Sequence, residues 1–313
     1  MQTGGGFYSM FVLLAAMLVP PAVSAAQHVS VGVLAHRGVE TAIAMWTPTV
    51  DYLSEQIPRR EFDLLPLDLS GMSAALEHGE LDFILTNPGN YVELEAGHGI
   101  TRIATLKNIR QGRLSKTFGA VIFTREARAD IHTLADLRGK TFAAVDQSAF
   151  GGFQMAWREL RDAGIDPFRD FRTLHFPGFP QDRIVFDVRD ARVDAGTVRT
   201  DILEGLDAQG LIELAEFRIL NRQSNNDFPF LHSTRLYPEW AFAKGRQTPD
   251  ELASEVVIAL LQMPGEHAAS RAGGYAGWTV PLNYQPVHDL FRQLDIGPYA
   301  RAGQFRLCVA VRV

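Results

Sequence analysis

The sequence predicts an α/β protein of two lobes with a ligand-binding cleft between them. Short apolar runs alternate with amphipathic stretches along the chain, which is the pattern of sheets covered by helices on both faces. The pattern occurs in two successive blocks, the second beginning near Phe118, and a C-terminal stretch follows that must pack against one of them. The 313 residues are 46% hydrophobic and 21% charged, as in a globular chain of about two domains.

The first 26 residues are typical of an export signal. Phe7 to Pro20 form an apolar run, shorter than the ~20 residues of a membrane-spanning helix, and the small residues AVSAA follow. We expect cleavage near Ala25 or Ala26, or retention of the segment as an N-terminal membrane anchor, and a periplasmic location for the remainder. The leading MQTGGG has no Lys or Arg, and a buried N-terminal helix is the alternative.

The first block is predicted to have the order strand, helix, strand, helix, strand. The strands are expected at 29–34, 62–67 and 81–85, and the helices at 44–57 and 70–78. Trp46, Val50 and Leu53 recur at helical spacing in the first helix, and Pro48 fits its first turn. Asn87-Pro88-Gly89 is a turn signal that closes the last strand.

The second block has the same alternation. Strands are expected at 119–124, 141–145, 171–176, 193–198 and 217–220, and helical segments at 134–137, 153–163, 182–190 and 201–209. Gly164 and Gly210 end two of these helices. A polar loop at 221–227 and helices at 250–261 and 286–294 complete the chain.

The composition argues against several classes of function. The formal charge of −6 is the wrong sign for a nucleic-acid clamp. A single cysteine, Cys308, excludes an internal disulfide framework, a Cys-rich zinc site and an iron–sulfur cluster. The sequence has no H-x-x-x-H pair, no G-x-S-x-G and no phosphate loop. We therefore expect no catalytic residue, no metal and no cofactor.

Loops that follow strands are the candidate ligand contacts, because ligands of open α/β sheets bind beyond the carboxyl ends of the strands. They lie at 35–40, 86–91, 146–152, 177–182 and 197–201. The segment Ser148 to Gly152 opens a helix, whose unpaired N–H groups and dipole favour an anion or a carboxylate-like group. The alternative is that Ser148 only caps the helix while Gly151 and Gly152 close a tight turn.

Polar side chains in the other loops have two interpretations each. Arg199 can make a charge-assisted contact to an oxyanion, or it pairs with Asp201, Asp194 or Glu204. Thr86 and Asn87 bind the ligand or only form a hydrogen-bonded turn, and Gln181 donates to the ligand or to its own backbone.

Three blocks of sequence resemble a known family. LDFILTNPGNYVEL, DLRGKTFAAVDQSAFGGFQMAWRELRDAGIDP and QDRIVFDVRDARVDAGTVRTDILE are similar, in this order, to the periplasmic phosphonate-binding-protein-like family of phosphate and phosphonate ABC importers. The phrases AFGGFQMAWREL, DAGTVRTD, FPFLHSTRLYPEWAFA and GWTVPLNYQPVHDLF are most similar to the periplasmic sensing region of tetrathionate-sensor-type histidine kinases. The resemblance covers residues 29 to 300.

The resemblance implies a type II solute-binding fold with a hinge of two crossover strands, near 111–118 and 214–220. Residues 27–115 and 218–313 would form the first lobe, and residues 116–217 the second. Tyr237, Trp240, Trp278 and Tyr284 would then be core or surface residues of the first lobe.

The implied function is a periplasmic domain that closes on a small anionic solute, an oxyanion, as the sensing part of a two-component histidine kinase system. A membrane-bound kinase region would be its partner, since these residues contain no kinase catalytic region. The alternative is a free-standing substrate-binding protein of a phosphate/phosphonate-type ABC importer, with an ABC permease as partner. An enzyme of the same fold would need a nucleophile in the cleft, and Cys308 lies in the terminal tail.

The sequence departs from the family at the expected site. The phosphonate binders have a run of hydroxyl residues where this chain has Ser148-Ala149-Phe150, a histidine at Gln181 and an aromatic hydroxyl near Thr86. These departures favour a different oxyanion, for instance one that contains sulfur. The expected contacts are a helix-start cradle with a charge partner, and polar donors from both lobes: Ser148, Gly151, Gly152, Arg199, Thr197, Gln181, Thr86 and Asn87.

Overall fold

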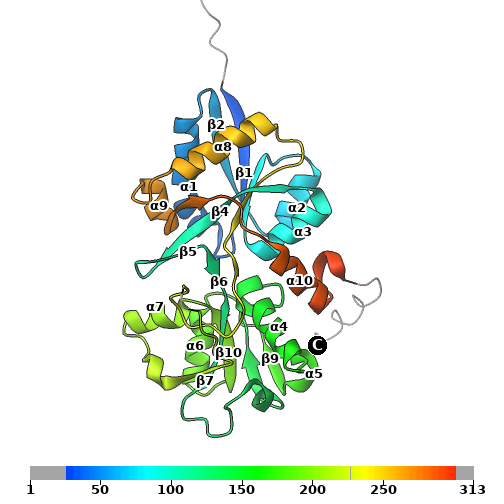
Figure 1. Ribbon diagram of the computed structural model, residues 1–313, viewed down its shortest axis with the longest axis vertical. Coiled ribbons are helices and arrows are strands. Elements are labelled where there is room, and N and C mark those ends of the chain that lie inside the picture. Colours follow the sequence, from blue (N-terminus) through cyan, green and yellow to red (C-terminus); the bar gives the residue numbers. More distant parts are fainter. Residues whose placement is uncertain (1–25, 226, 301–313) are drawn as a thin grey trace, which may run out of the picture.

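A computed structural model describes residues 26–225 and 227–300 of the chain (Figure 1). Two sheets, each with its own helices, lie one above the other along the long axis of the molecule. The expected export segment and Cys308 lie outside the described residues, apart from Ala26. None of the helices in the described part combines the length and the apolar character needed to cross a membrane.

The first lobe contains a seven-stranded sheet with the strand order β14-β4-β13-β3-β1-β2, and β5 paired to β4. Its strands are β1 (Gln27–Leu34), β2 (Arg60–Leu67), β3 (Phe83–Thr86), β4 (Thr101–Arg110), β5 (Arg113–Ser115), β13 (Ala241–Lys244) and β14 (Tyr275–Thr279). Its helices are α1 (Val39–Gln56), α2 (Leu69–Glu77), α3 (Pro88–His98), α8 (Asp250–Gln262) and α9 (Ala268–Gly273). All four residues of β3, FILT, are buried, as expected for a central strand covered on both faces.

The second lobe contains a five-stranded sheet with the order β11-β7-β10-β8-β9. Its strands are β7 (Ala120–Arg125), β8 (Thr141–Ala143), β9 (Thr173–His175), β10 (Ala195–Arg199) and β11 (Phe217–Leu220). Its helices are α4 (Met155–Asp162), α5 (Pro167–Asp170), α6 (Asp182–Arg189) and α7 (Ile202–Ala208), with shorter turns η1 (Leu134–Leu137), η2 (Phe150–Gln154) and η3 (Leu214–Glu216).

Two short strands connect the lobes. β6 (Thr117–Phe118) and β12 (Tyr237–Pro238) pair antiparallel to one another (Figure 1). The expected second crossing at 214–220 is wrong, because β11 pairs with β7 inside the second sheet. The loop after β11 also stays with this lobe, since Ser233 bonds to Ala120 and Leu220. The chain therefore returns to the first lobe at β12, not at residue 218.

Several elements of the first lobe differ from the prediction. The strands β4, β5, β13 and β14 are not among the elements that the sequence predicts. The helix α1 begins at Val39 rather than at residue 44, so Pro48 lies in its interior and not in its first turn. The unpredicted β4 forms one wall of the cavity described below.

Buried apolar clusters occur within each lobe and between them. The cluster that joins the lobes includes Phe150 from the second lobe, whose ring lies 5.3 Å from Tyr237 of the hinge and 6.3 Å from Phe291. Phe291 belongs to α10 (Gln285–Leu294), which contacts both α3 and α4; the turn η4 (Gly297–Tyr299) follows it. This shared cluster places the loops of the two lobes against each other.

Candidate ligand-binding cleft

A cavity of about 710 Å³ is lined by residues of both lobes. Six of the eight residues expected from the sequence line it: Asn87, Ser148, Gly151, Gly152, Gln181 and Arg199. Thr86 and Thr197 do not, since both are fully buried in strands. Thr86 donates from Oγ1 to Asn90 Oδ1 at 2.7 Å and so braces the start of α3. Thr197 Oγ1 is buried without a partner in the part of the chain that the structure describes.

Asn87 lies where β3 gives way to α3. Its Oδ1 accepts from the backbone N–H of Asn90 at 3.0 Å, and Pro88 occupies the first helical position, so Asn87 is the N-cap. This bond agrees with the alternative interpretation that Asn87 forms a hydrogen-bonded turn. Asn87 nevertheless lines the cavity.

The segment from Ser148 to Gly152 also has structural reasons for its residue types. The backbone N–H and the hydroxyl of Ser148 both donate to Asp146 Oδ1, at 2.8 and 2.6 Å. A Cβ on Gly151 would lie 2.8 Å from the Phe118 ring, and one on Gly152 would overlap Val145. Packing therefore requires both glycines. Since the Ser148 hydroxyl is already bonded to Asp146, the backbone N–H groups of the first helical turn are the donors that remain for an anion.

Arg199 is held in ion pairs by two carboxylates. Its Nη1 lies 2.7 Å from Asp201 Oδ1, its Nη2 bonds Glu239 Oε1, and its guanidinium lies 4.6 Å from the centre of the Phe118 ring. Burial opposes the charged form, but Glu239 and Asp201 outweigh it and raise the pKa of Arg199. The alternative interpretation of an ion pair with Asp201 therefore holds, with Glu239 as a second partner.

Gln181 also stabilises the cavity wall, through a hydrogen bond to the backbone of Arg199. Its Oε1 accepts from the backbone N–H of Arg199 at 2.8 Å, which joins the start of α6 to the end of β10. Among the described residues its Nε2 has no bond, so the amide nitrogen remains available to a ligand in the cavity that Gln181 lines.

The same charge network reaches across the cleft. Arg110, at the end of β4, places its Nε 3.1 Å from Asp201 Oδ2 and donates from Nη1 to the Gly274 carbonyl at 2.7 Å. Burial, together with the neighbouring Arg199, lowers the pKa of Arg110. The positive charges of Arg110 and Arg199 are therefore balanced by the carboxylates of Asp201 and Glu239.

Arg37 lines the cavity, and its charge is not paired with a carboxylate of the described residues. It is exposed in the loop after β1, and no described residue forms an ion pair or hydrogen bond with its side chain. Its neighbour His36 is mostly buried, and this burial lowers the pKa of His36 to about 4. At neutral pH the loop after β1 thus contributes one cation and one uncharged imidazole.

Aromatic side chains form the apolar wall. The ring of His36 lies 5.0 Å from Trp240 and 5.5 Å from Phe179, which comes from the second lobe, and Trp240 stacks on Trp46 at 6.3 Å. Trp240 packs against the core of the first lobe, as expected, and it also lines the cavity. The His36–Phe179 contact joins the two lobes.

The cavity continues into the first lobe along β4. Leu106, Asn108 and Arg110 alternate on one face of this strand and all line it, opposite Met45 and Trp46. The sequence did not single out these residues because β4 itself was not predicted. The available signal was the two-residue turn Gln111-Gly112, whose positive φ values of 49° and 73° connect β4 to β5.

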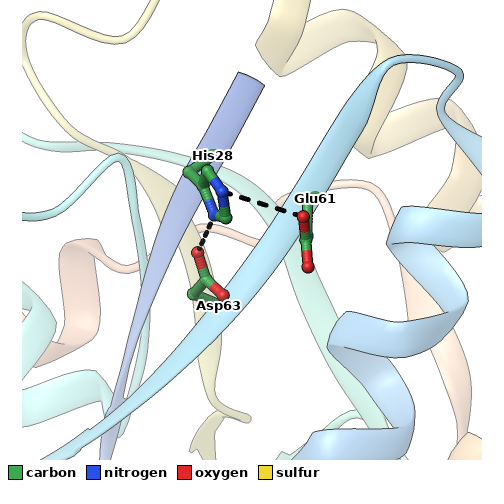
Figure 2. A group of neighbouring side chains, drawn as sticks. All are labelled: His28, Glu61 and Asp63. Atoms are coloured by element: carbon green, nitrogen blue, oxygen red, sulfur yellow. Dashed lines mark hydrogen bonds and ion pairs between the residues drawn. The ribbon is translucent and has the colours of Figure 1, made fainter. Parts of the chain in front are cut away.

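A group with metal-binding residue types lies outside the cavity (Figure 2). His28 on β1 and Glu61 and Asp63 on β2 each offer a ligand atom, all within 4.8 Å of one another, and all three side chains are exposed. The His28 ring contacts Asp63 at 2.7 Å and Glu61 at 3.7 Å through its two nitrogens. The bond to Asp63 raises the pKa of His28, which favours the protonated imidazole, a donor to both carboxylates.

Comparison with known sequences identifies the family of the chain and a curated relative. The family model described as "ABC transporter, phosphonate, periplasmic substrate-binding protein" matches residues 31–284. The tetrathionate sensor histidine kinase TtrS of Salmonella typhimurium is 37% identical over 274 residues, which cover 87% of this chain and 44% of that protein. The chain thus spans less than half the length of this curated relative.

Solved structures have the same two-lobed fold. XAC2383 from Xanthomonas citri bound to ATP has a TM-score of 0.69 at 20% identity, covering 86% of this chain and 98% of its own. PhnD1 from Prochlorococcus marinus in complex with methylphosphonate has a TM-score of 0.64 at 14% identity, covering 86% and 98%. The sulphonate-binding protein SsuA from Escherichia coli has a TM-score of 0.52 at 16% identity, covering 87% and 88%. The expected two-lobed architecture with a two-strand hinge is confirmed.

Proposed function

The chain belongs to the periplasmic substrate-binding protein family of phosphonate ABC transporters, and we propose that it is the sensing domain of a two-component system that closes on a small oxyanion. The observation that carries the proposal is the cavity between the lobes, which is lined both by Arg37, a cation without a partner among the described residues, and by the helix start at 150–152 with its N–H groups. The family is one of binding proteins rather than enzymes. The similarity to TtrS supports a sensing role, with a membrane-bound kinase region as partner.

The proposed ligand is an elongated sulfur oxyanion such as tetrathionate, which is the anion in the name of the relative. The cavity volume of about 710 Å³ and its aromatic wall of Trp46, Trp240, His36 and Phe179 suit a ligand with an apolar middle. A single tetrahedral phosphorus oxyanion has no such middle, and Ser148, the one retained hydroxyl of the family's run, already donates to Asp146.

The proposed mechanism is hinge closure about β6 and β12. Asn87, His36 and Arg37 come from the first lobe, whereas Gln181, Phe179 and the 150–152 amides come from the second. A ligand that contacts both sets binds the closed arrangement better than an open one, and so shifts the population toward it. In this proposal the chain is exported, residues 1–26 are the export signal or an anchor, and Ser148, Gly151, Gly152, Gln181, Asn87 and Arg199 surround the ligand, with Thr86 and Thr197 supporting them.

The test is calorimetric titration of the purified protein with tetrathionate, thiosulfate, sulfate, phosphate, methylphosphonate and ATP. We expect tetrathionate to bind with the lowest Kd and to raise the melting temperature, since a ligand of the native state at 100 times its Kd adds about 2.7 kcal/mol. Failure of all these anions to bind would contradict the proposal. If ATP instead binds with the lowest Kd, the ligand class is a nucleotide and not a sulfur oxyanion.

A second candidate is a substrate-binding protein that delivers an anion to an ABC permease. The description of the matching family and the structural similarity to methylphosphonate-bound PhnD1 favour it. Preferential binding of methylphosphonate or phosphate over sulfur oxyanions in the same titration would select this candidate.

A further inference from the structure

We propose that Asn108 and Arg110 on β4 form a second polar subsite, which binds the far end of an elongated ligand whose near end lies at the helix start of the second lobe. The inference rests on the proposed function and adds to it a requirement on the ligand: two polar ends joined by an apolar middle. It is carried by the side-chain amide of Asn108, by the position of β4 and by the shape of the cavity.

The first observation concerns the Asn108 amide. Asn108 is 5% exposed, lines the cavity, and has an Oδ1 that is buried without a hydrogen-bond partner; among the described residues its Nδ2 has no partner either. A buried amide without partners is costly, and buried polar groups are almost always satisfied. Rotation of the amide presents either its donor or its acceptor to whatever occupies the cavity. The missing partner is therefore expected in the ligand.

The second observation concerns the register of the sheet. Thr105 of β4 and Thr86 of β3 lie at the same level, because both are opposite Ala241 of β13. β3 ends there, whereas β4 continues to Arg110, an overhang of ~16 Å at ~3.3 Å per residue. Asn108 and Arg110 therefore lie beyond the end of β3, where β4 pairs with β14 and β5.

The third observation is the separation of the two polar regions. The helix start of the second lobe, η2, contacts α3, whose N-cap is Asn87 at the end of β3. β13 lies between β3 and β4, so Asn87 and Asn108 on β4 are separated laterally by two strand spacings, ~10 Å. Met45, Trp46, Leu106 and Trp240 supply apolar surface to the same cavity. A ligand with an anionic group at each end and an apolar middle matches this arrangement of polar and apolar groups along the cavity.

Arg110 adds a guanidinium donor to this subsite, although its charge is paired with Asp201. Its Nε is paired with Asp201 and its Nη1 donates to the carbonyls of Ile109 and Gly274, while no described residue accepts a bond from its Nη2. It follows Asn108 by two residues and so lies on the same face of the strand. Together the two side chains offer amide and guanidinium donors to one oxyanion end.

The test uses two probes that differ only in the second end: propane-1,3-disulfonate and propane-1-sulfonate, with tetrathionate as a third. In the unmodified protein we expect the disulfonate to bind at least tenfold more tightly than the monosulfonate, by calorimetry. Asn108→Leu should weaken the disulfonate and tetrathionate at least tenfold and change the monosulfonate less than twofold. Lys107→Gln, on the opposite face of β4 and outside the cavity, removes a neighbouring cation and should change none of the three.

Asn108→Asp keeps the size of the side chain and places a repulsive charge in the subsite, so it serves if the leucine variant does not fold. It should give the same selective loss. An equal loss of affinity for all three anions, or no loss for any, would overturn the subsite. In that case, tetrathionate binding by the unmodified protein would still leave the proposed function intact. Absence of tetrathionate binding and of sulfonate binding in the unmodified protein would overturn both.

Discussion

Arg110 of the first lobe and Asp201 of the second form an ion pair across the cleft, with 3.1 Å between Nε and Oδ2. Asp201 also pairs with Arg199 at 2.7 Å, and its carbonyl accepts from Gln111 Nε2 at 3.2 Å. One residue thus joins β4, β10 and the turn after β4. Because it is 8% exposed, its charge is little screened by solvent.

Asp201→Asn should lower the free energy of unfolding by about 1–3 kcal/mol, because Arg110 loses its carboxylate partner. The substitution adds little backbone strain, since asparagine tolerates the left-handed conformation that Asp201 adopts at φ 77°. A saturating anion should recover part of the loss by pairing with Arg110. Urea unfolding with and without tetrathionate measures both effects. Asp190→Asn, which removes a carboxylate paired on the surface of the second lobe, is the control and should leave stability almost unchanged.

Arg37→Gln should weaken anion binding tenfold or more without changing the melting temperature. The reason is that Arg37 has no partner among the described residues, so its loss removes only a charge-assisted bond to the ligand, worth about 1.5–3 kcal/mol. Titration calorimetry and a thermal melt measure the two quantities. Arg59→Gln removes an exposed cation of the same lobe outside the cavity and should leave affinity unchanged. Equal affinities of the Arg37 variant and the unmodified protein would exclude a contact with the anion.

Arg199→Ala should reduce stability and binding together. Glu239 is 1% exposed and Asp201 8% exposed, so removal of the arginine leaves the Glu239 carboxylate buried without a counter-charge. Breaking such a pair by removing one partner costs about 3–5 kcal/mol. Denaturant unfolding monitored by circular dichroism checks the cost. A variant with normal stability and tenfold weaker anion binding would instead assign Arg199 to the ligand alone.

His36→Phe should make the stability of the protein less sensitive to acid. The folded protein holds the pKa of His36 at about 4, below its ordinary value of 6.5, mainly through burial. Between these values the unfolded chain binds a proton that the folded chain does not, so stability is full above pH 6.5 and falls as the pH falls toward 4. Phenylalanine keeps the aromatic contacts to Trp240 and Phe179 without the titration. Identical pH profiles of the two proteins between pH 7 and pH 5 would show that His36 does not contribute.

Gly152→Ala should destabilise the second lobe by about 1–3 kcal/mol, the usual cost of overpacking, because the added Cβ overlaps Val145. Gly97→Ala is the matched control, since Gly97 lies in α3 with open space around its Cα. That change should stabilise the protein by about 0.5–1 kcal/mol. Thermal unfolding of both variants distinguishes a packing role from a role in ligand approach. A stable Gly152→Ala protein that no longer binds anions would show that the glycine serves the ligand.

The sequence by itself determined the α/β alternation, the two lobes and the family. These follow from local patterns, such as the apolar run of β3, the turn signal Asn87-Pro88-Gly89, and the helix start after Ser148, which depend on neighbours a few residues away. Six of the eight expected residues line the cavity for the same reason, since loops after strands gather at the carboxyl edge of a sheet.

Only the tertiary structure decided which of these side chains are paired within the protein and which are available to a ligand. Arg199, at the end of β10, meets Glu239, which directly follows the hinge strand β12 and is forty positions away, and no local pattern encodes that contact. The position of Asn108 depends on the register between β3, β13 and β4, which brings together strands from both ends of the chain. Pairing of distant charges and the overhang of one strand are properties of the packed sheet, so they fix the chemistry of the cleft after the local patterns have fixed its location.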